Sequence, residues 1–300
     1  MTTARDVKSR IDSVENVRTI TRTMKAVASA KLSKAKDRIE RTRPYGNTIE
    51  ETIKHVLARH PDLKHSYFYR SEDGNEEQDD SDKFSLYLLL TADRGLCGSF
   101  NSNILSRAEE IIEREDDPRF YVIGKRGVSY AGNNFSSRVI ENKQNIWDDL
   151  DYGVATRLTH ELVDEFELSD ASSVTIVFNE FESAMVQNVV EYPLLPLDRE
   201  DFYNLDDQDG SSQQVDFKYE PDPDSVINRL FPRHVRTQVY VSMLESFASE
   251  QGARMVAMDN ATENANEMIE DLTLEYNQLR QATITKEIAE IVGGAEALKG

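Results

Sequence analysis

Apolar side chains recur at helical spacing over the first forty-three residues, a stretch without glycine or proline. Large apolar residues follow one another every three or four positions, at Val7, Ile11, Val14, Val17, Ile20, Met24 and Val27. This spacing places the side chains on one face of an α-helix. Pro44 and Gly46 predict a bend, after which residues 48–59 continue as helix before Pro61.

A second long helix is predicted at the other end of the chain. No proline follows Pro232, and the apolar positions approach a heptad repeat at Met258, Ala261, Ala265, Met268, Leu272, Tyr276 and Leu279. A helix from about residue 235 to residue 292 would be roughly 85 Å long at 1.5 Å per residue. We expect the two terminal helices to pack as an antiparallel coiled coil, and their surplus length to contact another molecule.

Between these helices the hydrophobic pattern changes to that of an α/β domain. Strands are predicted at residues 84–91, 120–124, 174–178 and 186–192, and helices at residues 102–114 and 147–166. Alternation of strands and helices favours a partly parallel sheet. The acidic stretches 71–82 and 198–224 are predicted to be surface loops.

The predicted elements divide the chain into three parts. Residues 1–60 form an N-terminal shaft helix, residues 61–225 form the central α/β domain with its acidic loops, and residues 226–300 form a C-terminal shaft helix.

Charge is unevenly distributed along the chain, whose 300 residues carry a formal net charge of −20. Residues 1–43 hold 12 Lys or Arg and 5 Asp or Glu, a net of +7, so the remainder carries −27. A basic helix on an acidic protein indicates nucleic acid, an anionic surface or an acidic protein as partner, or simply a solvated face. The acid excess elsewhere is common in proteins that work at high salt, so a salt-adapted host is a hypothesis.

Composition excludes several classes of protein. The longest apolar run, residues 86–90, is far shorter than the roughly 20 residues of a membrane span. No apolar stretch typical of a secretory signal occurs near the N-terminus. Cys97 is the only cysteine, which excludes an intramolecular disulfide. We expect a soluble, cytosolic chain.

Candidate catalytic motifs are incomplete. The glycine-containing loop at residues 93–98 resembles a phosphate-cradling turn, but GxxxxGK[ST] and GxGxxG are both absent, which favours a tight turn between strand and helix. His55, His60 and His65 are spread around a helix, and Asp164 replaces the second histidine of an HExxH motif that His160 would begin. The sequence therefore predicts no catalytic site, no cofactor and no metal.

Four separated motifs resemble the γ subunit of F-type ATP synthases. Residues 284–297, ITKEIAEIVGGAEA, meet every fixed position of the pattern [IV]TxExx[DE]xxxGAx[SAKR]. The other motifs are ASEQGARMVAM at 248–258 with EYNQLRQA at 275–282, ITRTMKAVASAKL at 20–32, and TADRGLCG at 91–98. Their order and spread make the resemblance cover nearly the whole chain.

This resemblance implies a rotor subunit that couples rotation of the membrane c ring to ATP synthesis and hydrolysis. The two terminal helices would form a coiled-coil shaft inside a ring of three α and three β subunits. A Rossmann-like α/β domain would contact the ε subunit and the c ring. The chain would regulate ATPase activity and proton flow without being catalytic itself. It would lie peripherally at the cytoplasmic face of the cell membrane, bound to no nucleic acid and not inserted in the bilayer.

The resemblance also implies contact residues. By motif match, Met24 and Lys25 are expected near acidic loops of the catalytic subunits. Arg280, Gln281 and Thr285 are expected near ring loops from the opposing helix. The alternative for each is an ordinary coiled-coil surface residue.

Three rival functions remain open at this point. The central domain could be a nucleotide-dependent enzyme, the basic N-terminal segment could bind nucleic acid with a steep salt dependence, or the chain could be a regulatory scaffold. None of them accounts for the C-terminal motif.

Overall fold

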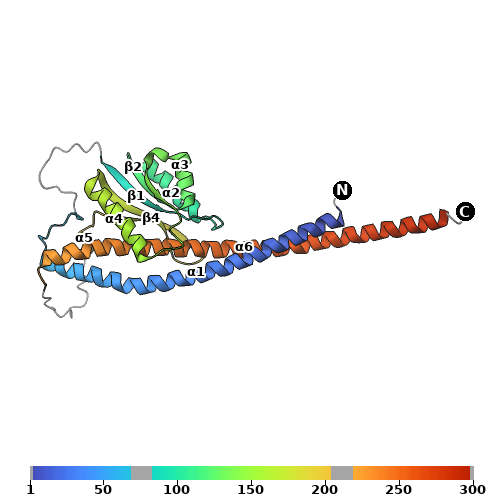
Figure 1. Cartoon of the computed structure of the whole chain (residues 1–300), viewed down its shortest axis with the longest axis horizontal. Helices are drawn as coiled ribbons and strands as arrows, with labels where there is room; N and C mark the ends of the chain where they lie inside the picture. The colour runs from blue at the N-terminus through green and yellow to red at the C-terminus, as the bar shows by residue number, and fades with distance from the viewer. Residues whose placement is uncertain (1–2, 69–82, 204–218, 298–300) are drawn as a thin grey trace. The chain divides into compact units, whose positions relative to one another are not determined.

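The computed structural model describes residues 3–68, 83–203 and 219–297 (Figure 1). Its elements, in chain order, are α1 (Ala4–Arg59), β1 (Phe84–Leu90), α2 (Phe100–Arg114), β2 (Pro118–Ile123), α3 (Lys125–Asn134), η2 (Ser136–Arg138), β3 (Val139–Lys143), α4 (Tyr152–Leu168), β4 (Ala171–Phe181), β5 (Gln187–Leu195), α5 (Glu200–Tyr203) and α6 (Pro223–Ala297). The chain divides into two compact units. We call residues 1–29 with 254–300 the helical unit, and residues 30–253 the sheet unit. Helices α1 and α6 each contribute to both units.

The sheet unit is built on five strands in the order β3-β2-β1-β4-β5 (Figure 1). Strands β3, β2, β1 and β4 are parallel to their neighbours, whereas β5 is antiparallel to β4. The central strand β1 is apolar at every position except Ser85 because both of its faces are covered, and Leu86, Leu88, Leu89 and Leu90 are fully buried. The predicted partly parallel α/β architecture between two long helices is confirmed.

One face of the sheet packs against α2 and α3. Tyr87 and Leu89 of β1 meet Phe120 and Val122 of β2 on this face, under Phe100 and Ile104 of α2. Helix α4 contacts β4 and contributes a buried row of its own at Leu158, Leu162 and Phe166. Because successive side chains along a strand point to opposite faces of the sheet, the strands contribute to one apolar layer on each face.

Three elements of the sheet unit, α3, η2 and β3, have no prediction from sequence, and α5 forms within the stretch predicted to be a loop. Helix α3 contains two glycines and buries only Gly127 and Ala131, so its sequence lacks the row of large apolar residues that predicts a helix. Strand β3 lies at the sheet edge and is largely exposed, which removes the alternation that marks a half-buried strand. The helix predicted at 147–166 begins instead at Tyr152, because the Asp151 side chain caps it by accepting a hydrogen bond from Val154 N at 2.7 Å.

The long helices are more continuous than predicted. Helix α1 shows no break at Pro44, and α6 begins at Pro223 instead of near residue 235 and contains Pro232. A proline within a helix removes one backbone hydrogen bond, but buried side chains on either side of Pro44, including Ile39 and Ile49, hold α1 in place. The helix predicted at 48–59 is therefore the end of α1.

The predicted acidic loops fall mostly outside the described residues. The stretch 71–82 lies wholly outside them, as does most of 198–224. At the described edges of the second stretch, α5 forms immediately after residue 199 and α6 begins at residue 223.

Candidate protein-interaction surface

Three polar contacts join α1 to α6 in the helical unit and set an antiparallel register. They are Thr21 Oγ1 with Thr262 Oγ1 at 2.7 Å, Lys25 Nζ with Asp259 Oδ1 at 2.5 Å, and Arg18 Nη1 with Asn266 Oδ1 at 3.4 Å. Positions on α1 rise as their partners on α6 fall, so the helices run in opposite directions. The predicted antiparallel pair is confirmed, and its seam is partly polar.

The buried seam of α1 differs from the apolar stripe predicted from sequence. Val7, Thr21 and Ala28 are 0%, 7% and 1% exposed, and they fall one or two heptads apart. The half-buried positions between them are Ile11, Val14, Arg18, Met24 and Lys25. The buried positions of a coiled coil recur every 3.5 residues on average. Apolar residues spaced three apart therefore move progressively away from that seam. Val17, Ile20 and Val27, which the sequence pattern places on one face with Val7 and Val14, therefore lie outside the buried seam.

These three side chains form an exposed apolar strip on α1. Val17, Ile20 and Val27 are 51%, 57% and 52% exposed. On α6, Met268 is exposed although the heptad predicted it buried, and Leu274 is exposed as well. Isolated exposed apolar residues are ordinary, but several on one slender pair of helices indicate a surface that meets another protein.

Helix α6 extends beyond the N-terminal end of α1 within the helical unit. The register places the start of α1 opposite about residue 280 of α6, so the last 17 residues of α6 run on for about 25 Å. Every side chain from Arg280 to Gly293 is exposed. Four of them are large and apolar: Ile284, Ile288, Ile291 and Val292.

The structure places the five predicted contact residues in two groups. Met24 and Lys25 are half-buried beside the seam, and Lys25 forms an ion pair with Asp259 of α6. Arg280, Gln281 and Thr285 are exposed where α6 passes the end of α1, and Thr285 Oγ1 donates to Gln281 O at 2.9 Å. The groups lie about 30 Å apart along α6, so they do not form one site.

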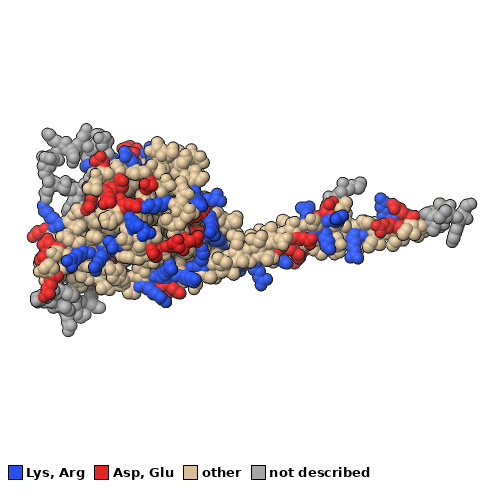
Figure 2. All heavy atoms as spheres, in the orientation of Figure 1, with Lys and Arg blue, Asp and Glu red and all other residues tan. Residues whose placement is uncertain are grey.

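Charge on the helical unit is nearly balanced. Its residues include 10 Lys or Arg and 12 Asp or Glu, a net of −2, which leaves −18 on the sheet unit. The Lys and Arg excess on α1 is opposed there by the acid excess on α6, and Figure 2 shows tan stretches between small groups of both signs. The basic N-terminal segment thus has an acidic partner within the chain, which weakens the nucleic-acid hypothesis.

The loop at residues 93–98 is held by the sheet unit itself. Asp93 Oδ1 accepts hydrogen bonds from Lys125 N and Asn145 N, both at 3.0 Å. Cys97 is buried and its sulfur accepts a hydrogen bond from Asn101 Nδ2 at 3.2 Å. These hydrogen bonds give the loop a structural role, as a turn that holds α2 against the sheet.

The crevice beside β1, where α/β sheets commonly bind nucleotides, is filled by α6. Strand order reverses between β1 and β4, and ligands of such sheets bind at the carboxyl ends of the strands near that point. Here Ser246 of α6 donates to Leu90 O at 3.4 Å. Phe247 stacks on Trp147, whose indole N–H donates to Thr91 O at 2.9 Å. The geometry therefore gives no support to nucleotide binding at this loop.

Over the described ranges, no three His, Cys, Asp or Glu side chains converge as a metal site would require. In the same ranges, no helix combines the length and the apolar composition needed to span a bilayer.

Comparison with known proteins gives matches along the full chain. The family model described as ATP synthase matches residues 3–298. The ATP synthase gamma chain of Salinibacter ruber is 40% identical, covering 100% of this chain and 99% of its own. The gamma chain of Halothermothrix orenii is 39% identical over the whole of both chains.

Solved structures give the same result. A chain from the central stalk and c ring of the Tetrahymena thermophila mitochondrial ATP synthase is 26% identical, with a TM-score of 0.58 over 81% of this chain and 99% of that one. A chain of the Euglena gracilis mitochondrial enzyme shares the fold, at 20% identity and a TM-score of 0.67, over 98% of this chain and 94% of that one. With full-length relatives near 40% identity, the chain belongs to the family of ATP synthase gamma chains.

Proposed function

We propose that this chain is the central rotor subunit of an F-type ATP synthase. The observation that carries the proposal is the antiparallel helical unit, which exposes apolar side chains on α1 and α6, in a chain that matches gamma chains over its full length. The helical unit would turn inside a ring of three α and three β subunits. The ε subunit and the membrane c ring would contact the sheet unit.

The exposed side chains suit a rotating contact. Apolar groups such as Val17, Ile20 and Ile288 gain free energy from burial without a fixed partner atom, whereas a tight ion pair would have to break at every step. The absence of symmetry between α1 and the longer α6 means that the three catalytic sites around the ring would meet different surfaces. Rotation would then drive each site through its conformations in turn.

The five predicted contact residues belong to this proposal. Lys25 keeps a 40% exposed side chain despite its ion pair, so its ammonium group has donors for a carboxylate of a catalytic subunit. Met24 lies beside it as a flexible apolar contact. Arg280, Gln281 and Thr285 would contact ring loops from α6, where their side chains are exposed.

Charge reversal of Arg280 tests this assignment. Arg280→Glu in the assembled enzyme should lower the coupling between ATP hydrolysis and proton pumping, most strongly at low salt, because a guanidinium is replaced by a carboxylate at a ring contact. The matched control is Arg229→Glu, which makes the same charge change at an exposed position of α6 in the sheet unit. Unaltered coupling in Arg280→Glu at every salt concentration would remove Arg280 from the contact.

The remaining parts of the proposal concern the assembled enzyme. The chain would carry no catalytic site of its own, in accord with the filled crevice beside β1. It would regulate ATPase activity and proton flow through its position in the ring. Its place would be peripheral, at the cytoplasmic face of the cell membrane. The charge of −18 on the sheet unit would keep the subunit hydrated and soluble in a salt-rich host.

A further inference from the structure

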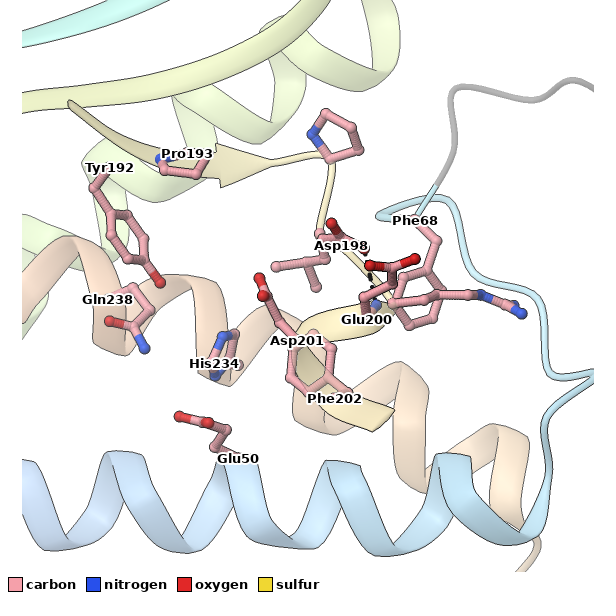
Figure 3. A pocket seen from close by; sticks show the side chains of 13 residues that line it. Glu50, Phe68, Tyr192, Pro193, Asp198, Glu200, Asp201, Phe202, His234 and Gln238 are labelled. Carbon is pink, nitrogen blue, oxygen red and sulfur yellow. Dashed lines mark hydrogen bonds between the residues drawn. The ribbon is translucent and has the colours of Figure 1, made fainter. Parts of the chain in front are cut away.

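The sheet unit contains a cavity of about 960 Å³ that the rotor function does not use. Figure 3 shows its walls, which come from four elements: Glu50 of α1, Tyr192 of β5, Asp201 and Phe202 of α5, and His234 with Gln238 of α6. A cavity of this size is in the range that holds a small organic ligand.

His234 is a buried polar group that faces this cavity. Its side chain is 5% exposed, and neither ring nitrogen makes a hydrogen bond to any residue in the described ranges. Its ring packs edge-on against Phe202 at a centroid distance of 5.5 Å. A buried imidazole without a partner loses its hydrogen bonds to water. It therefore offers an unused polar contact to whatever enters.

The protonation state of His234 determines which contact it offers. Burial lowers its pKa to about 4, the carboxylate of Glu50 opposes that change, and the ammonium group of Lys54 adds to it. Tyr192 enters the same space, and burial raises its pKa to about 12 with help from Glu50 and Asp201. Both groups are neutral at pH 7, so the imidazole presents one acceptor nitrogen.

Carboxylates line the cavity on two sides. Asp201 and Glu50 lie near Tyr192 and His234, while Asp198 and Glu200 lie near Phe68 (Figure 3). Among the described residues, no Lys or Arg is within ion-pair distance of the three carboxylates at positions 198, 200 and 201.

Two cations at these walls, Arg199 of the lining and Lys54 beside Glu50, are already engaged. Lys54 lies 2.7 Å from Glu50 Oε1. Arg199 donates to the carbonyl oxygens of Pro61 and Leu63, and its guanidinium lies 4.7 Å from the centre of the Phe68 ring. The cavity is therefore left with an excess of negative charge.

The arrangement of these groups indicates the class of ligand. In the described ranges, no three acidic side chains lie close enough together to coordinate one metal ion. They stand instead along one wall, with Asp201 toward Tyr192 and with Asp198 and Glu200 toward Phe68, and the aromatic ring of Phe202 lies below Asp201 (Figure 3). A ligand that matches has separated cationic groups joined by an apolar chain. We propose that this cavity binds an alkyl polyamine, with one ammonium group at Asp201 and another at Asp198 and Glu200.

Calorimetric titration of the full chain with spermidine in about 0.15 M salt tests the proposal. We expect saturable binding of one spermidine per chain. The double variant Asp198→Asn with Asp201→Asn should weaken it at least tenfold. His234→Gln should weaken it less, because only one acceptor changes. The matched control Glu113→Gln with Asp149→Asn alters the net charge equally at exposed positions outside the cavity and should bind as the unmodified chain does.

Two results would overturn the proposal. Binding that does not saturate and is reduced equally by both double variants would be an adventitious ion only, held by the overall charge of −20. Displacement of spermidine by Mg²⁺ at equal concentration would show an ordinary cation preference for the carboxylates. Circular dichroism of each variant establishes that it is folded, and none of these substitutions touches the helical unit, so the outcome is independent of the rotor function.

Discussion

At the scale of single residues, polar side chains fix the pairing of α1 with α6, through Thr21 with Thr262 and Lys25 with Asp259. Thr21 is buried on the seam of α1 and Lys25 lies half-buried beside it, yet neither is apolar, so the apolar pattern pointed to Val17 and Ile20 instead. The signal that could have found the seam is the strict heptad from Val7 through Thr21 to Ala28. Polar side chains that form hydrogen bonds between the two helices do not appear in a pattern of apolar positions. They can be recognised only once the position of the partner helix is known.

His234 gives a prediction for the dependence of stability on pH. Its folded pKa of about 4 lies below the unfolded value of 6.5, so between these values the unfolded chain binds the extra proton. The free energy of unfolding should therefore be full above pH 6.5 and fall by about 3 kcal/mol as the pH drops to 4. Urea unfolding of the unmodified chain and of His234→Gln at pH 7, 6, 5 and 4 isolates this contribution. A His234 NMR signal that titrates near pH 6.5 would contradict it.

Gly124 gives a second prediction at this scale. Its φ is +97°, and a Cβ there would lie 2.1 Å from Thr91 O, at the turn between β2 and α3. Gly124→Ala should therefore lower the free energy of unfolding by roughly 2 kcal/mol or more. The matched control is Gly132→Ala in α3, where a Cβ meets open space and should stabilise the helix slightly. Equal effects of the two substitutions in urea unfolding would contradict the geometry.

At the scale of elements, strong periodicity predicted the central strands and the two long helices. The existence of β1, β2, β4, β5, α2 and α4 followed from buried apolar runs. The edge strand β3 and the helix α3 bury too few side chains to leave such a pattern. Prolines misled the reading of helix ends, because tertiary packing keeps α1 and α6 helical through Pro44 and Pro232.

Replacement of Pro44 tests the continuity of α1. Pro44 is exposed in the interior of the helix and lacks the backbone donor for Glu40 O. Pro44→Ala should restore that hydrogen bond and raise the free energy of unfolding by about 1–3 kcal/mol. Chemical unfolding followed by circular dichroism measures the change. A decrease in stability would mean that the chain needs a bend at this position.

At the scale of the whole molecule, the family was predictable from motifs, whereas the interaction surface was not. The pattern at residues 284–297 identifies the family without any structure, and the matches to full-length gamma chains agree with it. The register of α1 on α6 decides which side chains remain exposed, and that register depends on contacts such as Thr21 with Thr262. The cavity beside His234 joins residues that are up to about 190 positions apart, so no local motif could mark it.

The net charge of the chain predicts that its thermal stability depends on salt concentration. With −20 on the chain and −18 of it on the sheet unit, self-repulsion should destabilise the fold at low ionic strength. The melting temperature should rise between about 0.05 M and 1 M KCl as screening grows. Thermal unfolding monitored by circular dichroism measures this rise. An unchanged melting temperature at very low salt would count against adaptation to a salt-rich host.

The most direct test of the rotor function is reconstitution with the α and β subunits of the same organism. ATP hydrolysis is measured for the chain alone, for the α and β subunits, and for the mixture, at several salt concentrations. We expect no hydrolysis by the chain alone, and a complex with one copy of the chain per three α and three β subunits that hydrolyses ATP faster than the ring without it. Hydrolysis by the isolated chain, or failure to join the ring at any salt concentration, would contradict the assignment as a rotor.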